Sequence, residues 1–156
     1  MERLVKILRA RDNGTFVVNP MGTFTGYGGY VGINPYREHA GEASEELGEL
    51  VLELLEQSGP TGFRIEEIEP YREDTTDPET DRVREAHIPK TSSTAAMAKR
   101  YARAQVSRKD RQKSWKITTY RYDSTRKLDV TDEEVRVPCK EGPSALGRRI
   151  LELLEV

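Results

Sequence analysis

Apolar residues recur at helical spacing in two segments of nearly identical sequence. The first reads LGELVLELLE at 47–56 and the second reads LGRRILELLE at 146–155, so seven of ten positions are identical. In the first segment the apolar positions follow the i, i+3, i+4, i+7, i+8 spacing of an amphipathic helix, with glutamates on the opposite face. We expect Ser44 to cap this helix and the Gly-Pro pair at 59–60 to end it. The Gly-Pro pair at 142–143 is expected to begin the second helix.

A glycine lies on the apolar side of each predicted helix, at Gly48 and Gly147. Glycine inside a helix costs about 1 kcal/mol relative to alanine, so its recurrence at the same phase needs a reason. We interpret both glycines as points where the helix backbone approaches a sheet closely. The alternative, a tolerated surface glycine, is weakened by the repetition.

Strand-like alternation precedes each helix. Val31 and Ile33 alternate in GYGGYVGINPY, Val135 and Val137 alternate in EEVRVPC, and a proline closes each stretch. Further strands are predicted at 4–10, 15–18, 105–109, 115–122 and 127–130.

The two halves combine into one predicted architecture. Each half has several antiparallel strands followed by one helix, which predicts an α+β single domain over 1–156. The domain consists of two strand-rich β…βα repeats, at about 1–60 and 93–156, with antiparallel sheets. Between them, a connector at about 64–92 is highly charged and lacks periodicity, so we expect an exposed loop.

A short helix is predicted directly after the connector, in SSTAAMAKRYARA at 92–104. Ser92 or Ser93 is a suitable N-cap for it. Its apolar edge consists of Met97, Tyr101 and Ala104.

Charge is divided unevenly along the chain of 156 residues, whose formal net charge is −2. The segment 42–85 has 15 acidic and four basic residues, whereas the segment 99–127 has 11 basic and two acidic ones. The two segments either build fields of opposite sign on different faces or hold each other in contact.

Three features of the sequence indicate the cellular compartment. Cys139 is the only cysteine, so no internal disulfide is expected. No apolar run approaches the roughly 18 residues of a membrane span. The N-terminal stretch MERLVKILRARDNG lacks the apolar region of a signal peptide. We therefore expect a cytoplasmic protein with no membrane partner.

Catalytic and cofactor motifs are missing from the sequence. There is no phosphate-binding loop and no dinucleotide fingerprint. His39 and His87 lack a second ligand at i+3 or i+4, and Cys139 has no basic partner that the sequence identifies. The acidic triplet in 77–81 lacks the glycine and terminal glutamate of an EF-hand. We expect no enzyme, no metal and no cofactor.

Two surfaces are candidates for binding. The acidic run suits a basic partner, such as a nuclease whose cleft attracts phosphate, although each carboxylate can also be an ordinary solvated side chain. Its residues are Glu66, Glu67, Glu69, Glu73, Asp74, Asp77, Glu79 and Asp81. The alternative is a face shared by Lys116, Tyr120 and Tyr122, whose cation and aromatic rings suit single-stranded nucleic acid. Aromatic residues are also simply good strand formers.

Two long stretches resemble a known family. They are GTFVVNP…GYVGINPYREHAGEASEELGELVLELLEQSG and SWKITTYRYDSTRKLDVTDEEVRVPCKEGPSALGRRILELLEV. Their strand-rich halves, each closed by a Leu-Gly-containing helix, are similar to the contact-dependent growth-inhibition immunity proteins of the CdiI type. The acidic stretch EPYREDTTDPETDRVREAH departs from the family in length and charge.

The resemblance implies a fold, a partner and a role. The fold would be Whirly-like, with two strand-rich repeats each closed by a helix. The partner would be the C-terminal toxin domain of a cognate CdiA effector, which the protein would bind and block without catalytic residues or cofactors. Nucleic acid is a partner only under the alternative, and a homodimer is left open.

Overall fold

The structure is a computed structural model that describes residues 2–67, 77–88 and 92–156. The strands are β1 (Glu2–Ala10), β2 (Phe16–Thr25), β3 (Tyr27–Gly32), β4 (Arg37–His39), β5 (Gly59–Arg64), β6 (Tyr101–Lys109), β7 (Ser114–Asp123) and β8 (Leu128–Pro138). The helices are α1 (Ser44–Glu56), α3 (Pro78–His87), α4 (Thr94–Arg100) and α5 (Gly142–Leu153), with short 3-10 turns η1 (Ile65–Glu67) and η2 (Cys139–Glu141).

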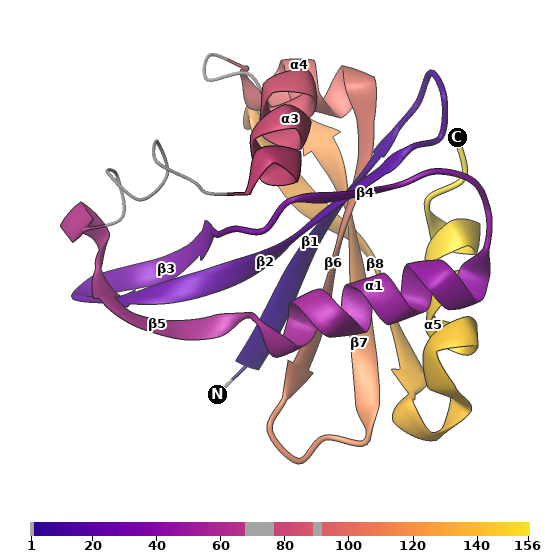
Figure 1. The fold of residues 1–156 in the computed structure, drawn as a ribbon. Coiled ribbons are helices and arrows are strands. Elements are labelled where there is room, and N and C mark those ends of the chain that lie inside the picture. Colours follow the sequence, from indigo (N-terminus) through magenta and orange to yellow (C-terminus); the bar gives the residue numbers. More distant parts are fainter. Residues whose placement is uncertain (1, 68–76, 89–91) are drawn as a thin grey trace.

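One sheet joins the two halves of the chain (Figure 1). Its strand order is β3-β2-β1-β6-β7-β8, and β4 and β5 also pair with β2. Every pairing is antiparallel except the parallel one between β2 and β5. At the centre, β1 of the first half pairs with β6 of the second over their whole length. The predicted α+β single domain is confirmed.

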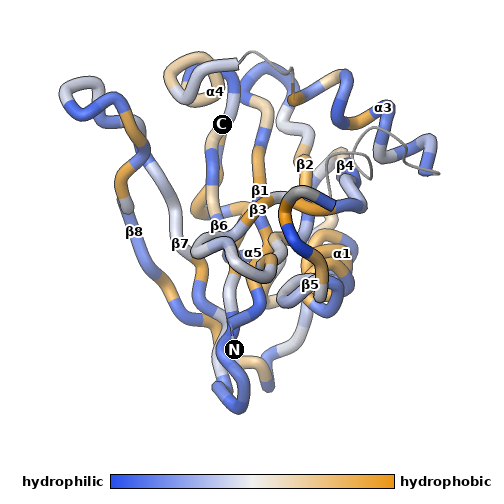
Figure 2. Tube along the Cα trace, turned by 90° about the vertical axis from the view of Figure 1, so that its left-hand side faces the viewer, coloured by the Kyte–Doolittle hydropathy of each residue, from blue (hydrophilic) through white to orange (hydrophobic). Residues whose placement is uncertain are grey.

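The main core lies between one face of this sheet and the pair α1 and α5. On that face β1 presents Val5 and Ile7, which are fully buried. The buried members of the two helical stripes are Leu47, Val51, Leu54, Leu55, Leu146, Ile150 and Leu154. A smaller cluster on the opposite face packs under α3 and α4. Hydrophilic residues gather on β8 and α3, away from the main core (Figure 2).

The helix glycines contact a helix and not the sheet, so the prediction of a sheet approach was wrong. A Cβ placed at Gly48 would lie 1.9 Å from the carbonyl oxygen of Pro143 at the start of α5. A Cβ at Gly147 would lie 1.8 Å from the carbonyl oxygen of Ser44 at the start of α1. Each repeated glycine therefore admits the first turn of the other helix, because only a residue without Cβ permits this approach.

Two arginines on β1 bind the C-terminal ends of these helices. Arg3 Nη1 donates to the carbonyl oxygens of Glu56 at 2.6 Å and Ser58 at 3.1 Å, at the end of α1. Arg9 Nη1 donates to the carbonyl oxygen of Leu154 at 2.9 Å, at the end of α5. The guanidinium groups satisfy carbonyls that have no partner within the helix and oppose the negative end of its dipole.

Two helix boundaries differ from the prediction. The helix expected over 92–104 ends at Arg100, and Tyr101 and Ala104 belong to β6, where pairing with β1 and β7 outweighs their helix propensity. Its predicted cap is confirmed, since the side chain of Ser93 accepts a hydrogen bond from Ala96 N. In α1 the N-cap is Ala43, without a side-chain bond, and Ser44 is already helical.

The connector and the number of strands also differ from the prediction. Residues 78–87 form α3, where a loop was predicted, with Asp77 at the N-cap and Pro78 at the first turn. The short strands β4 and β5 were not predicted, and β3 ends before Ile33. The two strands predicted near 127–130 and 133–139 are one strand, β8, whose register shifts opposite Thr119 and Tyr120.

Candidate functional site

The described part of the acidic run is partly occupied by internal contacts. Glu69, Glu73 and Asp74 lie outside the described residues, and of Glu66 only its place in η1 is described. Glu67, also in η1, is exposed and accepts a hydrogen bond from Arg64 N at 3.0 Å. Asp81 is exposed on α3. The structure thus leaves the carboxylates of Glu67 and Asp81 on the surface.

Asp77 and Glu79 contribute to holding α3 on β4. The Asp77 carboxylate accepts from Arg37 Nη1 at 2.6 Å and from the Thr80 hydroxyl at 2.7 Å. Glu79 adds an ion pair to Arg37 Nε at 3.6 Å. The hydrogen bonds from Thr80 and then Arg37 lower the pKa of Asp77 from 3.8 to about 2. Both carboxylates therefore have structural roles.

A second acidic surface lies on the solvent side of α1. All its members are exposed, and none forms an ion pair with a residue that the structure describes. They are Glu45, Glu46, Glu49, Glu53 and Glu56. Unpaired carboxylates along one helix give this side of the molecule a negative potential.

A cluster around His87 fastens the other end of α3. His87 Nε2 lies 2.7 Å from Glu38 Oε2 on β4, and His87 Nδ1 lies 2.9 Å from the Tyr101 hydroxyl on β6. Arg82 Nη1 contacts the second Glu38 oxygen at 2.7 Å. Desolvation would raise the pKa of Glu38, but the hydrogen bonds from His87 and Arg82 lower it. This cluster joins one helix to two strands.

The aromatic candidates share the outer face of β7, the face opposite α1 and α5. Lys116, Tyr120 and Tyr122 alternate there, as the sequence predicted, while Trp115 and Ile117 enter the main core. The Tyr120 hydroxyl donates to Gln105 Oε1 at 2.8 Å. Burial, and then the charges of Glu134 and Asp129, raise the pKa of Tyr120.

Acidic residues accompany these side chains on the neighbouring strand. In the register of β7 and β8, Thr118 is opposite Glu134 and Tyr122 is opposite Asp129. Asp129 also forms an ion pair with Arg103 of β6. The outer face is therefore mixed in charge and not a continuous basic stripe.

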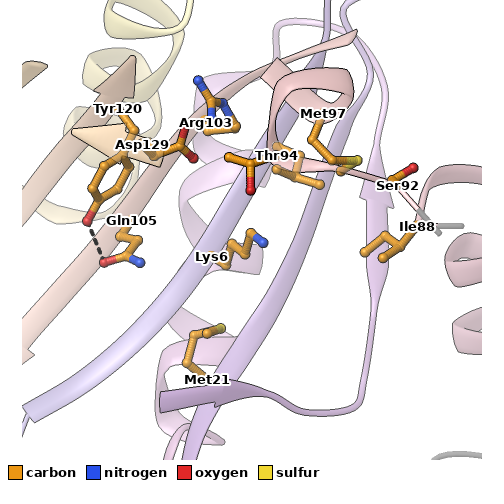
Figure 3. A pocket seen from close by; sticks show the side chains of 12 residues that line it. Lys6, Met21, Ile88, Ser92, Thr94, Met97, Arg103, Gln105, Tyr120 and Asp129 are labelled. Atoms are coloured by element: carbon orange, nitrogen blue, oxygen red, sulfur yellow. Dashed lines mark hydrogen bonds and ion pairs between the residues drawn. The ribbon is translucent and has the colours of Figure 1, made fainter. Parts of the chain in front are cut away.

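The same outer face contains a hollow of about 440 Å³ between β1, β6, β7 and α4 (Figure 3). Its polar wall includes Arg103, Gln105, Tyr120, Thr94 and Asp129, and its apolar wall includes Leu8, Met21, Ile88 and Met97. Lys6 extends from β1 into the middle of this ring of side chains. Burial lowers the pKa of the Lys6 amine; Asp129 raises it and Arg103 lowers it further.

The sequence interpretation missed this hollow, which uses residues from both halves. One signal was present, since Lys6 interrupts the apolar stretch LVKIL in a strand that the sequence predicts. Its neighbours in space, Gln105 and Asn19, are known only from the strand register.

Among the described residues, no group of three or more His, Cys, Asp or Glu side chains is placed to hold a metal ion. No helix in the described ranges has the length and hydropathy needed to cross a membrane.

Comparison with known proteins shows similarity at the level of structure. No protein-family model matches the chain, and no curated protein matches it. A protein of unknown function from Neisseria meningitidis superposes with a TM-score of 0.62 at 16% identity, over 96% of this chain and 93% of that chain. A chain of a CdiA-CT/CdiI toxin and immunity complex from Yersinia pseudotuberculosis superposes with a TM-score of 0.59 at 14% identity, over 99% and 98%. At these identities the similarity shows a common fold.

Proposed function

We propose that this protein is an immunity protein that binds the C-terminal toxin domain of a cognate CdiA effector in the cytoplasm and neutralises it. The observation that carries the proposal is the similarity over 99% of the chain to a chain of a toxin and immunity complex. The sequence resemblance to CdiI proteins points the same way. Its action would be stoichiometric binding, not catalysis.

The mechanism is occlusion of the toxin's active or substrate-binding surface. A nuclease toxin has a basic cleft that attracts phosphate, and acidic side chains of the immunity protein would occupy that field. Within the acidic run, Glu67, Glu79 and Asp81 are exposed, and Glu67 and Asp81, which form no ion pair with a described residue, are the ones to test first. Asp77 and Glu79 support this surface indirectly by fixing α3 on Arg37. The glutamates of α1 form a separate negative surface, on a helix that packs against the other face of the sheet.

Co-expression with the toxin domain encoded next to this gene tests the function itself. Cells that produce this protein in folded form are expected to survive, whereas cells without it die. Death of the protected cells, with folded protein present, would contradict the proposed function.

Paired charge reversals test the surface separately from the function. We expect Glu67→Lys with Asp81→Lys to slow association with the toxin roughly tenfold or more, because steering depends on charge near the contact. The control, Glu141→Lys with Glu155→Lys, makes the same change in net charge at exposed positions near α5. Equal rates for the two double variants would exclude the acidic run but leave the immunity function in place.

The second candidate function is binding of single-stranded nucleic acid. The common face of Lys116, Tyr120 and Tyr122 favours this function. The acidic residues of β8 that lie beside them on the same face oppose it, because they would repel phosphate. Titration with oligonucleotides at low and moderate salt separates the two functions. Tight binding that weakens steeply with salt, and is lost in Tyr122→Ala, would favour this candidate.

A further inference from the structure

The position of Lys6 at the centre of a sheet is energetically unusual. It lies on β1, in register with Asn19 of β2 and Gln105 of β6, so strands flank it on both sides. Its ammonium has no hydrogen bond or ion pair with any residue in the described ranges, and the adjacent Arg103 is already paired with Asp129. Lys6 is half-buried, and partial removal of an ammonium group from water costs free energy unless an anion accompanies it.

The surroundings of Lys6 have the composition of a small-molecule site. A volume of about 440 Å³ falls within the range of about 300–1,000 Å³ typical of ligand pockets. Apolar side chains form part of the lining, among them Leu8, Met21 and Met97; Met97 and Met21 lie on two different sides of Lys6 (Figure 3). Gln105 Oε1 accepts from Tyr120, which leaves the Gln105 amide nitrogen as a further donor.

The charged side chains that line the hollow indicate which class of ligand it would bind. Lys6 is the one cation of the described lining without a carboxylate partner, since Asp129 neutralises Arg103. Lys6, Arg103 and Asp129 give the described lining a formal net charge of +1, which suits a singly charged anion better than a phosphate dianion. A single negative charge next to an apolar wall matches a carboxylate attached to an aliphatic or aromatic body.

We propose that this hollow is a binding site for a small monocarboxylate with an apolar body, whose carboxylate is bound by Lys6 and Gln105. The proposal does not depend on the immunity function. Octanoate and phenylacetate are suitable probes, and octanamide, which has the same chain without the charge, is the ligand control.

Calorimetric titration of the full chain, with Lys6→Met and Lys109→Met as variants, tests the site. Octanoate or phenylacetate is expected to bind saturably, octanamide at least tenfold more weakly, because a charge-assisted hydrogen bond is lost. Lys6→Met is expected to weaken carboxylate binding at least tenfold. Lys109→Met, which removes an exposed lysine of β6 outside the hollow, is expected to leave carboxylate binding unchanged.

The amine itself provides a second readout. The Cε resonance of Lys6 reports its protonation in an NMR pH titration, and a bound carboxylate is expected to raise the pKa of this amine. Lys6→Met keeps the length of the side chain and removes an unpaired charge, so it is expected to fold. Lack of saturable binding by both carboxylates would overturn the proposal, as would equal affinity for octanamide or equal affinity of Lys6→Met.

Discussion

Alanine at the two helix glycines tests the packing of α1 against α5. In Gly48→Ala the new Cβ would lie 1.9 Å from the carbonyl oxygen of Pro143, and in Gly147→Ala 1.8 Å from that of Ser44. Real Cβ atoms essentially never approach closer than 3.0 Å. Both obstacles are backbone atoms, which cannot rotate away, so the helices must separate by about 1 Å.

Two opposing effects set the size of the change. Alanine is favoured over glycine inside a helix by about 1 kcal/mol. Overpacking costs about 1–3 kcal/mol, and more where the backbone has to move. Separation also loosens Leu47 and Leu146, which lie buried next to the crossing. We expect each single variant to lose about 2–4 kcal/mol of unfolding free energy. The double variant should lose less than the sum, because one displacement relieves both contacts.

Urea denaturation, followed by the fluorescence of the buried Trp115, measures these changes. The control uses the neighbouring exposed position, where Glu49→Ala should be more stable than Glu49→Gly by about 1 kcal/mol. At position 49 the alanine variant is therefore expected to be the more stable one, whereas at position 48 glycine is expected to be more stable than alanine. A Gly48→Ala variant as stable as the wild type would refute the helix crossing described here.

Three further predictions concern the core, the helix ends and α3. Leu54→Ala and Leu154→Ala should each lower the unfolding free energy by about 2–5 kcal/mol through lost burial and a cavity; wild-type-like thermal unfolding of both would contradict the core assignment. Arg9→Met should cost about 1–3 kcal/mol in urea, since it leaves the buried carbonyl of Leu154 without its donor. Asp77 has a lowered pKa in the folded state, so its contribution is present above pH 3.8 and is lost as the pH falls to about 2. Asp77→Asn should therefore be less stable than wild type at pH 7, and the difference should shrink between about pH 5 and 2; a difference independent of pH would exclude the ion pair as its cause.

Local patterns predicted the elements whose burial is regular. The stripes of α1 and α5 and the alternation of β7 are properties of a single segment, so the sequence alone reveals them. The partner of a buried face is not such a property. An apolar glycine indicates a close approach, but only the folded chain shows that Pro143 and Ser44, and not a strand, occupy the space.

The start of β6 illustrates a conflict between local and tertiary preference. Residues 98–104 read as a helix because alanine, lysine and arginine favour it. From Tyr101 onward, however, the backbone pairs with β1 on one side and, from Arg103, with β7 on the other. For α3 the opposite error occurred, since Asp77 followed by Pro78 is a helix start signal that high charge concealed.

The sequence predicted which residues belong to each candidate surface, but not which contacts those residues make in the folded chain. The acidic residues can be counted in the sequence, but Arg37, which holds two of them, lies 40 positions before Asp77. Likewise, Lys116 and Tyr120 share a face as predicted, whereas the carboxylates that moderate its charge come from β8.

The three cationic side chains of β1 have different roles on the two faces of the sheet. Arg3 and Arg9 face the main core, and each donates to carbonyl oxygens at a helix end. Lys6 faces the opposite side and has no acceptor among the described residues, although the same strand positions it. Lys6 is half-buried and lacks such an acceptor, so it does not stabilise the sheet in the way that the two arginines do. On the opposite side α3 and α4 cover part of the sheet, and the hollow around Lys6 is the part that remains open to a ligand.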